Sequence, residues 1–185
     1  MRALAVILIA AGLATADTPK RLYILHTNDI HGHMTDEGAT FISPEFYPTL
    51  NGSAGMATVI KQYRAKAAEE GSGFLLVDAG DIMQGTPESN FFYGESMNEI
   101  FNAFGEDAVE LGNHEFDFGM DKLHAWIGRA RHPVLASNLL DEKTGQTWEK
   151  VHPYVIRQFG DLRVGLIGII TNHMTALATP KNFAG

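Results

Sequence analysis

The sequence of 185 residues contains no cysteine, which excludes a disulfide framework and any metal site built on thiolates. Positive charge is also scarce. The 14 lysines and arginines are outnumbered by 22 aspartates and glutamates, so the formal net charge is −8 at pH 7. We therefore do not expect a basic face that binds a nucleic acid polymer. A small phosphate ester is still a reasonable ligand, because bound divalent cations can reverse the local field.

No apolar run reaches the roughly 20 residues that a membrane-spanning helix needs, so no stable membrane span is expected. The run Ala3–Leu13 follows Arg2 and precedes Ala14-Thr15-Ala16, a small-x-small pattern typical of signal-peptide cleavage. We expect residues 1–16 to be a signal peptide, cut before Asp17. The protein is then predicted to be exported, either periplasmic or secreted.

Short apolar runs alternate with helical patterns along the first three quarters of the chain. Strands are predicted at 21–26, 73–80, 107–112 and 133–137, and helices at 53–70, 94–105 and 120–131. This repeated strand–helix order indicates an α/β domain built largely on parallel strands. After a polar connection, the β-rich runs 154–159 and 162–170 flank Gly160-Asp161 and predict a hairpin.

Three of the predicted strands end in polar clusters. Asp29 and His31 follow the first strand, Asp81 follows the second, and Asn113 and His114 follow the third. In an open α/β sheet the carboxyl ends of the strands meet at one rim, where ligands collect. Aspartate, histidine and asparagine suit divalent cations such as zinc, manganese, iron or magnesium. Two such metals about 3.5–4 Å apart can clamp an in-line displacement at phosphorus.

His114 is a candidate for acid catalysis beside these metals. Asp117, three residues further on, can hold its second ring nitrogen and favour the cation, so that His114 could protonate a departing alkoxide. Loops between strands and helices are commonly rich in Gly, Asp and Asn, so one such cluster would be weak evidence. Three clusters in one series of strand ends favour a functional site.

The stretches TNDIHGH (27–33), GDIMQGTP (80–87) and GNHEFDFG (112–119) resemble the 5′-nucleotidase family of calcineurin-like metallophosphoesterases. The resemblance runs from about Leu22 to the end of the chain. It implies a calcineurin-like α/β/β/α sandwich with mixed sheets, incomplete in this chain. It also implies a phosphohydrolase with two divalent metal ions (Zn, Mn, Fe, Mg or Co) that cleaves small-molecule nucleotide phosphate esters by attack of a metal-bound hydroxide. With the expected signal peptide, the prediction is an exported enzyme of this type.

The resemblance also assigns roles to individual residues. It implies that one metal is bound by Asp29 and His31, that Asp81 bridges both metals, and that Asn113 binds the second metal. It further implies that His114 and Asp117 form the catalytic dyad.

Two features of the resembling family are missing from this sequence. The later Gly-His-x-His or Gly-His-x-Gln motif does not occur, and there is no C-terminal domain to hold the nucleoside. We therefore expect residues 17–185 to be the N-terminal portion of a metallophosphoesterase domain, and a fragment rather than a natural truncation. Alternatives are the same fold acting on 2′,3′-cyclic nucleotides or nucleotide sugars, or a truncated non-catalytic binding module.

The remaining polar and aromatic residues of interest receive simpler interpretations. Surface or packing roles are expected for the four histidines His124, His132, His152 and His173. Of the others, His33 is predicted to be a loop residue, Glu115 an acceptor of backbone hydrogen bonds or a support for the metal ligands, and Asn138 a support for the metal loop. The side chains expected in the core or covering it are Phe91, Phe92, Phe101 and Phe104.

Overall fold

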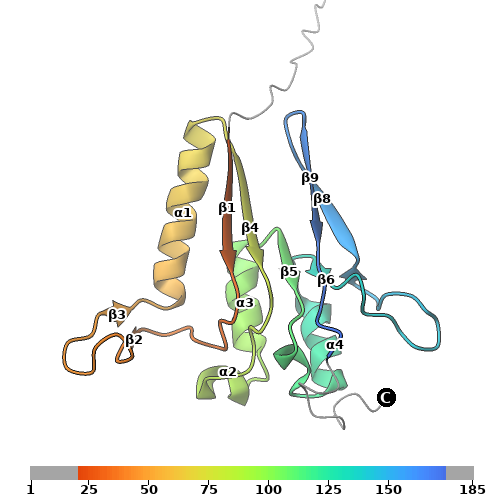
Figure 1. Ribbon diagram of the computed structural model, residues 1–185, viewed down its shortest axis with the longest axis horizontal. Helices are drawn as coiled ribbons and strands as arrows, with labels where there is room; N and C mark the ends of the chain where they lie inside the picture. The colour runs from red at the N-terminus through yellow and green to blue at the C-terminus, as the bar shows by residue number, and fades with distance from the viewer. Residues whose placement is uncertain (1–20, 174–185) are drawn as a thin grey trace, which may run out of the picture.

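The computed structural model describes residues 21–173 of the chain (Figure 1). The signal peptide expected at residues 1–16 lies outside this range, so it stays a prediction. Among the described residues, no helix is long and apolar enough to cross a membrane.

A five-stranded parallel sheet forms the centre of the fold, in the order β1-β4-β5-β6-β7. Its strands are β1 (Leu22–Thr27), β4 (Gly73–Asp78), β5 (Ala108–Glu110), β6 (Val134–Leu135) and β7 (Val151–His152). The first four confirm the predicted strands, although β5 and β6 are shorter than predicted. The sequence analysis missed β7 because two residues are too few to show a period of alternation.

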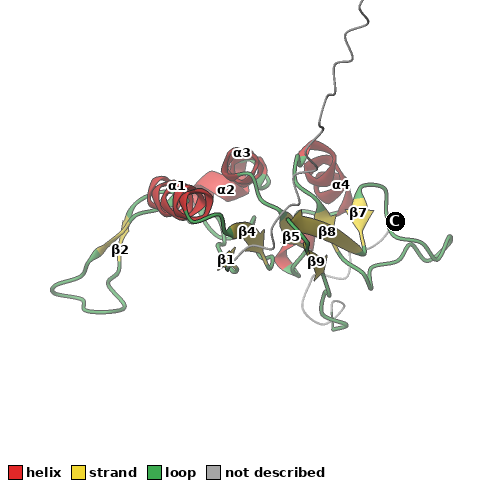
Figure 2. Cartoon of the chain, turned by 90° about the horizontal axis from the view of Figure 1, so that it is seen from above, coloured by secondary structure: helices red, strands yellow, loops and turns green. Residues whose placement is uncertain are grey.

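Three helices lie on one side of this sheet (Figure 2). They are α1 (Ser53–Glu69), α3 (Glu95–Phe104) and α4 (Met120–Arg129), as predicted. Between β4 and α3 the chain forms the short helix α2 (Pro87–Phe91), which the sequence analysis did not predict. Its start has a local cause: Thr86 accepts a hydrogen bond from the Ser89 amide, and proline occupies the first turn.

The main hydrophobic core lies between the sheet and helices α3 and α4. It includes Met97 and Phe101 from α3, Leu123 and Trp126 from α4, and Val109 from β5. A smaller cluster of Ile60, Leu76 and Phe104 joins α1 to the sheet.

The aromatic predictions for the core were only partly right. Phe101 and Phe104 are buried, as expected. Phe91 and Phe92 are 77% and 54% exposed, so they are not core residues. Both lie at the end of α2, whose position the sequence analysis could not supply.

The predicted hairpin is present as β8 (Tyr154–Phe159) and β9 (Leu162–Ile167), paired antiparallel around Gly160-Asp161. It lies on the side of the sheet opposite α4 (Figure 2). Arg157 fixes it there, because its Nε donates to Asp107 Oδ1 at 3.1 Å, just before β5. A helical layer, a parallel sheet and an antiparallel pair therefore follow one another, which confirms the predicted sandwich class for this part of the domain.

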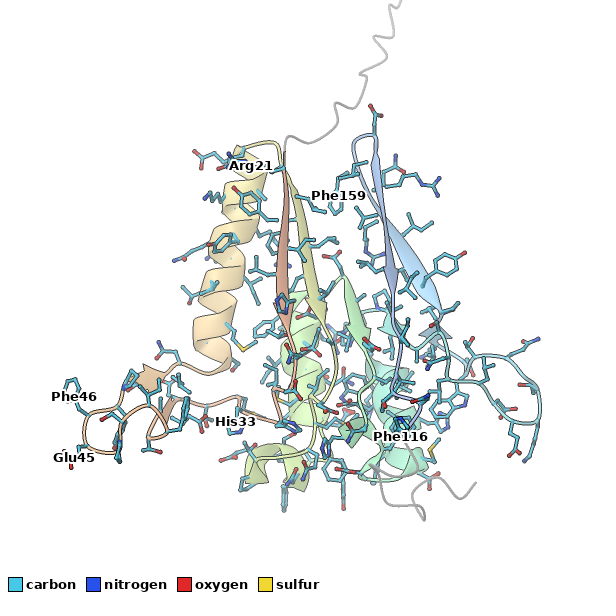
Figure 3. The ribbon with its side chains drawn as sticks, in the orientation of Figure 1. Arg21, His33, Glu45, Phe46, Phe116 and Phe159 are labelled. Atoms are coloured by element: carbon cyan, nitrogen blue, oxygen red, sulfur yellow. The ribbon has the colours of Figure 1, made fainter. Side chains whose placement is uncertain are left out.

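An arm formed by residues 36–51 extends away from this body. The strands β2 (Glu37–Gly38) and β3 (Thr49–Leu50) pair at its base. Figure 3 shows Glu45 and Phe46 at its tip, and Phe46 is 89% exposed. The sequence analysis predicted this segment as a loop, and the two short strands are the only regular structure that its described residues add.

Candidate metal centre

The loops that follow β1, β4 and β5 meet at one rim of the sheet, as the strand order requires. The Asp29 amide donates to the Gly80 carbonyl at 3.0 Å, and the His31 amide donates to the Asp81 carbonyl at 2.9 Å. The loop after β1 and the loop after β4 therefore continue to pair beyond the ends of their strands. This pairing brings the polar residues of both loops to the same place.

The backbone of these loops is strained at three of the predicted metal ligands. Asp29, His31 and Asp81 have φ angles of 53°, 49° and 58°, in the left-handed region that non-glycine residues seldom occupy. Such conformations cost roughly 1–3 kcal/mol each and persist where the surroundings enforce them, often at functional sites.

Two glycines allow the loops after β4 and β5 to touch. A Cβ atom at Gly112 would lie 2.2 Å from Asp81 Oδ1, and one at Gly80 would lie 2.4 Å from the Gly112 nitrogen. Any larger residue at either position would push the loop carrying Asp81 away from the loop carrying His114. Glycine is therefore required here by close approach of the backbone.

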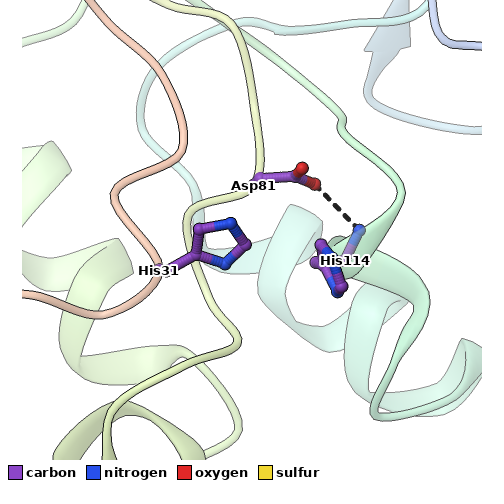
Figure 4. A group of neighbouring side chains, drawn as sticks. All are labelled: His31, Asp81 and His114. Atoms are coloured by element: carbon purple, nitrogen blue, oxygen red, sulfur yellow. Dashed lines mark hydrogen bonds between the residues drawn. The ribbon is translucent and has the colours of Figure 1, made fainter.

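Three side chains converge at the rim: His31, Asp81 and His114 (Figure 4). Each offers one atom able to bind a metal, and these atoms lie within 4.8 Å of one another. Asp81 Oδ1 accepts a hydrogen bond from the His114 amide at 2.9 Å. The ring centroids of His31 and His114 are 5.0 Å apart. Asp29 is close as well, with its Oδ1 at 3.8 Å from His31 Nε2.

The hydrogen bonding of His31 prepares it to bind a metal. Its Nδ1 lies 2.6 Å from the Gln84 carbonyl oxygen, which can only accept a hydrogen bond. Nδ1 therefore carries the proton, and Nε2 is left with a lone pair on the side of Asp29. The imidazole of His31 and the carboxylates of Asp29 and Asp81 are donors that suit borderline and hard divalent cations, so these residues fit a metal.

His114 is held by Asp117, as predicted. Its Nδ1–H donates to Asp117 Oδ2 at 2.6 Å. Burial alone would lower the pKa of His114, but the hydrogen bond and charge of Asp117, with the charges of Asp81 and Glu115, raise it above its usual value. The structure thus brings the predicted acid into the same cluster as two predicted ligands. Asn113 directly precedes His114 at this rim, and its role as a ligand stays a prediction.

Glu115 ties the loops after β4 and β5 together. Its buried carboxylate accepts hydrogen bonds from the amides of Ile82 at 2.7 Å, Asp81 at 2.9 Å, Met83 at 3.3 Å and Gly112 at 2.6 Å. Burial raises the pKa of Glu115, and the backbone donors oppose that shift. The expected backbone-acceptor role of Glu115 is confirmed. It fixes the backbone of Asp81 by accepting a hydrogen bond from its amide.

Sequence reasoning missed a second carboxyl group that organises the rim. Asp78, the last residue of β4, accepts from the Thr27 hydroxyl at 2.6 Å and from the Gly80 amide at 2.8 Å. Burial raises its pKa to about 7. The sequence does indicate this group, because Asp78 is an acidic residue at the end of an apolar strand, three residues before Asp81 in VDAGD.

The other sequence-predicted residues lie outside the cluster. The Asn138 amide exchanges hydrogen bonds with the backbone of Ile170, at 2.7 and 3.0 Å. It therefore ties the loop after β6 to the segment after β9, not to the metal loops. His33 is an exposed loop residue, as expected, and its Nδ1 lies 3.0 Å from a Glu37 carboxylate oxygen.

Surface or packing roles were expected for four further histidines, and the structure agrees. His132 is buried against the rings of Phe101 and Trp126. His124 packs on Trp148, at 4.8 Å between ring centroids, and His152 and His173 are exposed.

This fold and this rim match a known family of proteins. The sequence pattern of the family described as calcineurin-like phosphoesterase matches residues 22–167, most of the chain. The chain belongs to the calcineurin-like phosphoesterase family. Members of this family are metal-dependent hydrolases, in agreement with the cluster of donor atoms found here.

Several proteins that this chain resembles are named as nucleotidases. A 5′-nucleotidase of Vibrio vulnificus is 34% identical over 187 residues, which cover 96% of this chain and 31% of that protein. A 5′-nucleotidase precursor from Thermus thermophilus superposes with a TM-score of 0.70 at 29% identity, covering 83% of this chain and 29% of that one. The NAD nucleotidase of Haemophilus influenzae superposes with a TM-score of 0.72 at 26% identity, covering 84% of this chain and 27% of that one. The chain spans about a third of the length of the curated relatives it matches.

Proposed function

We propose that this chain carries the metal-binding part of an exported phosphohydrolase of the 5′-nucleotidase type. The observation that supports this most strongly is the convergence of His31, Asp81 and His114 at the carboxyl rim, with Asp117 bonded to His114. The names of the relatives favour a nucleotide as the small-molecule substrate. Export is inferred from residues 1–16 alone.

In this proposal the rim holds two divalent metal ions, drawn from zinc, manganese, iron, magnesium and cobalt. Asp29 and His31 would hold one ion, Asp81 would serve both, and Asn113 would offer its amide oxygen to the second. When bound, such a pair places positive charge against the phosphoryl oxygens and lowers the pKa of a water molecule that attacks phosphorus. Glu115 and Asp78 keep the ligand loops in place through their bonds to the backbone.

His114 supplies the proton for the leaving group. As the bond between phosphorus and the ester oxygen breaks, the departing alkoxide takes the proton from Nε2. Asp117, on Nδ1, keeps the ring oriented and stabilises its charged form. The raised pKa of His114 keeps it protonated closer to neutral pH than an ordinary histidine.

Two other functions remain as competing proposals. The same rim could act on 2′,3′-cyclic nucleotides or nucleotide sugars. The similarity to an NAD nucleotidase favours testing substrates linked through a diphosphate. Alternatively, the chain could be a non-catalytic binding module that keeps the family's fold.

Substrate profiling of the purified protein separates these proposals. We expect metal-dependent phosphate release from AMP, abolished by EDTA and by Asp81→Asn, and restored to the wild-type protein by added divalent metal. Faster hydrolysis of 2′,3′-cyclic AMP or of a nucleotide sugar than of AMP would instead assign that ester as the substrate class. Metal binding without hydrolysis of any of these esters would contradict the enzymatic proposal and favour a binding module.

A further inference from the structure

A cavity of about 450 Å³ lies between α1 and the strands β1 and β4, and its lining includes none of the residues assigned to the metals or to acid catalysis. Figure 1 shows α1 running alongside both strands. Its walls are mostly apolar and include Leu25 from β1, Met56, Val59 and Ile60 from α1, and Leu76 from β4. This size is typical of sites for small organic molecules.

One acidic side chain, that of Glu106, forms part of the cavity lining. Glu106 lies just before β5 and is only 6% exposed. Its Oε2 atom has no hydrogen-bond partner among the described residues. A buried acceptor without a donor destabilises the fold, and the cost is greater for a charged group. A ligand that brings a donor to this atom would recover that cost.

The charged groups around Glu106 favour a cation. Burial raises the pKa of Glu106 to about 8, and the nearby carboxylates of Asp78 and Asp107 raise it further, while Arg64 lowers it. The Arg64 guanidinium already donates to the carbonyls of Phe104 and Gly105. A cation brought to Glu106 would stabilise the ionised form of its carboxyl group against burial, whereas an anionic ligand would add to the negative charge of Asp78 and Asp107.

We propose that this cavity binds a small organic cation, an alkylammonium. Its N–H donates to Glu106 Oε2, and its hydrocarbon part lies against Leu25, Met56 and Ile60. This site goes beyond the proposed phosphohydrolase activity, because it uses none of the residues assigned to the metals or to acid catalysis. The cavity contributes an apolar wall and one acceptor, and these two features select an amine over an alcohol or a carboxylate of the same length.

Calorimetric titration of the full chain in EDTA, with three probes that share a six-carbon chain, tests this proposal. Hexylammonium should bind saturably at one site. Hexan-1-ol should bind roughly tenfold more weakly or worse, a difference of about 1.4 kcal/mol, and hexanoate more weakly still. Working in EDTA keeps the result independent of the metal site, so failure here and failure of the phosphohydrolase proposal remain distinguishable.

Two variants and one control locate the binding site. Glu106→Gln should bring hexylammonium affinity down to that of hexan-1-ol and leave the alcohol unchanged. Val59→Arg, at a side chain that is 47% exposed, should block the amine by adding a cation at the mouth while the fold is retained. Glu69→Gln, near the end of the same helix and outside the cavity lining, should have little effect.

Several results would overturn the proposal. These are no saturable binding of hexylammonium, equal affinity for the amine and the alcohol, tighter binding of hexanoate, or undiminished amine binding in Val59→Arg. Should Glu106→Gln fail to fold, the Val59→Arg result and the order of the three probes decide the question.

Discussion

Buried polar groups at the metal rim and buried polar groups elsewhere in the fold differ in their hydrogen bonding. At the rim, Glu115 accepts from four backbone amides and Asp78 from one amide and one hydroxyl. Away from it, Glu106 Oε2 and both ring nitrogens of His132 lack partners among the residues that the structure describes. The rim carboxyls therefore fix the backbone conformation of the loops. His132 instead contributes packing, and Glu106 is proposed to bind a ligand.

The largest expected effect concerns proton transfer at the rim. In the proposed enzyme, His114→Asn should lower kcat on a nucleotide ester by about 10²–10⁴-fold, because general acid catalysis is typically worth that much. Asp117→Asn should cost less, since the imidazole remains. The loss should shrink on p-nitrophenyl phosphate, whose leaving group needs little protonation. An equal loss on both esters, or loss of metal in His114→Asn, would mean that His114 binds phosphate or metal instead.

The next effect concerns the backbone acceptors. Glu115→Gln should lower the free energy of unfolding by about 3 kcal/mol, because an amide offers one acceptor oxygen where the carboxylate offers two. Metal content, measured by mass spectrometry on the folded protein, should fall as well, since the Asp81 loop loses its anchor. Glu142→Gln, at an exposed carboxylate, is the matched control. Unchanged stability and metal content in Glu115→Gln would remove the contrast between the two regions.

The next effect depends on pH and concerns His132, whose ring nitrogens lack hydrogen-bond partners among the described residues. Burial lowers the pKa of His132 to about 4, so the folded protein holds the neutral ring. Between pH 6.5 and about 4 the unfolded chain binds a proton that the folded protein does not, and stability falls as pH falls, by up to roughly 3 kcal/mol. His132→Phe keeps an aromatic ring against Phe101 and Trp126. In this variant the free energy of unfolding should change less with pH over the same range.

Urea unfolding at several pH values checks this prediction for His132. The variant His173→Gln, at an exposed histidine, serves as the control and should keep the wild-type slope. A His132→Phe protein that loses stability with acid as steeply as the wild type would show that His132 is not the group responsible.

The smallest effect concerns the hydroxyl that supports Asp78. Thr27→Val removes one hydrogen bond at nearly constant volume and should cost about 1 kcal/mol of stability. Thr58→Val, at an exposed residue of α1 that bonds within its own helix, provides a comparison and should cost less. A Thr27→Val protein as stable as the wild type would show that the Gly80 amide alone is enough for Asp78.

The sequence could predict those parts of the molecule whose signals are local. The strands ending before Asp29, Asp81 and Asn113 are short apolar runs, and their parallel pairing places the polar residues at one rim. The bond between His114 and Asp117 follows from a spacing of three residues. Such features need no knowledge of distant contacts.

The parts that could not be predicted depend on distant contacts. Phe91 and Phe92 are apolar yet exposed, because α2 leaves them outside the core. β7 exists only because Val151 and His152 meet β6. Likewise, the hydrogen bond between Thr27 and Asp78 joins residues of two different strands. No short-range pattern in the sequence predicts this pairing.

The most direct test of the metal site is anomalous diffraction from crystals grown with zinc or manganese. We expect one peak bounded by Asp29, His31 and Asp81, and a second on the side of Asp81 toward Asn113. Asp81→Asn should weaken both peaks, since this residue is assigned to both ions. Well-ordered metal peaks elsewhere on the molecule, with none at the rim, would contradict the assignment of the metal site to these loops.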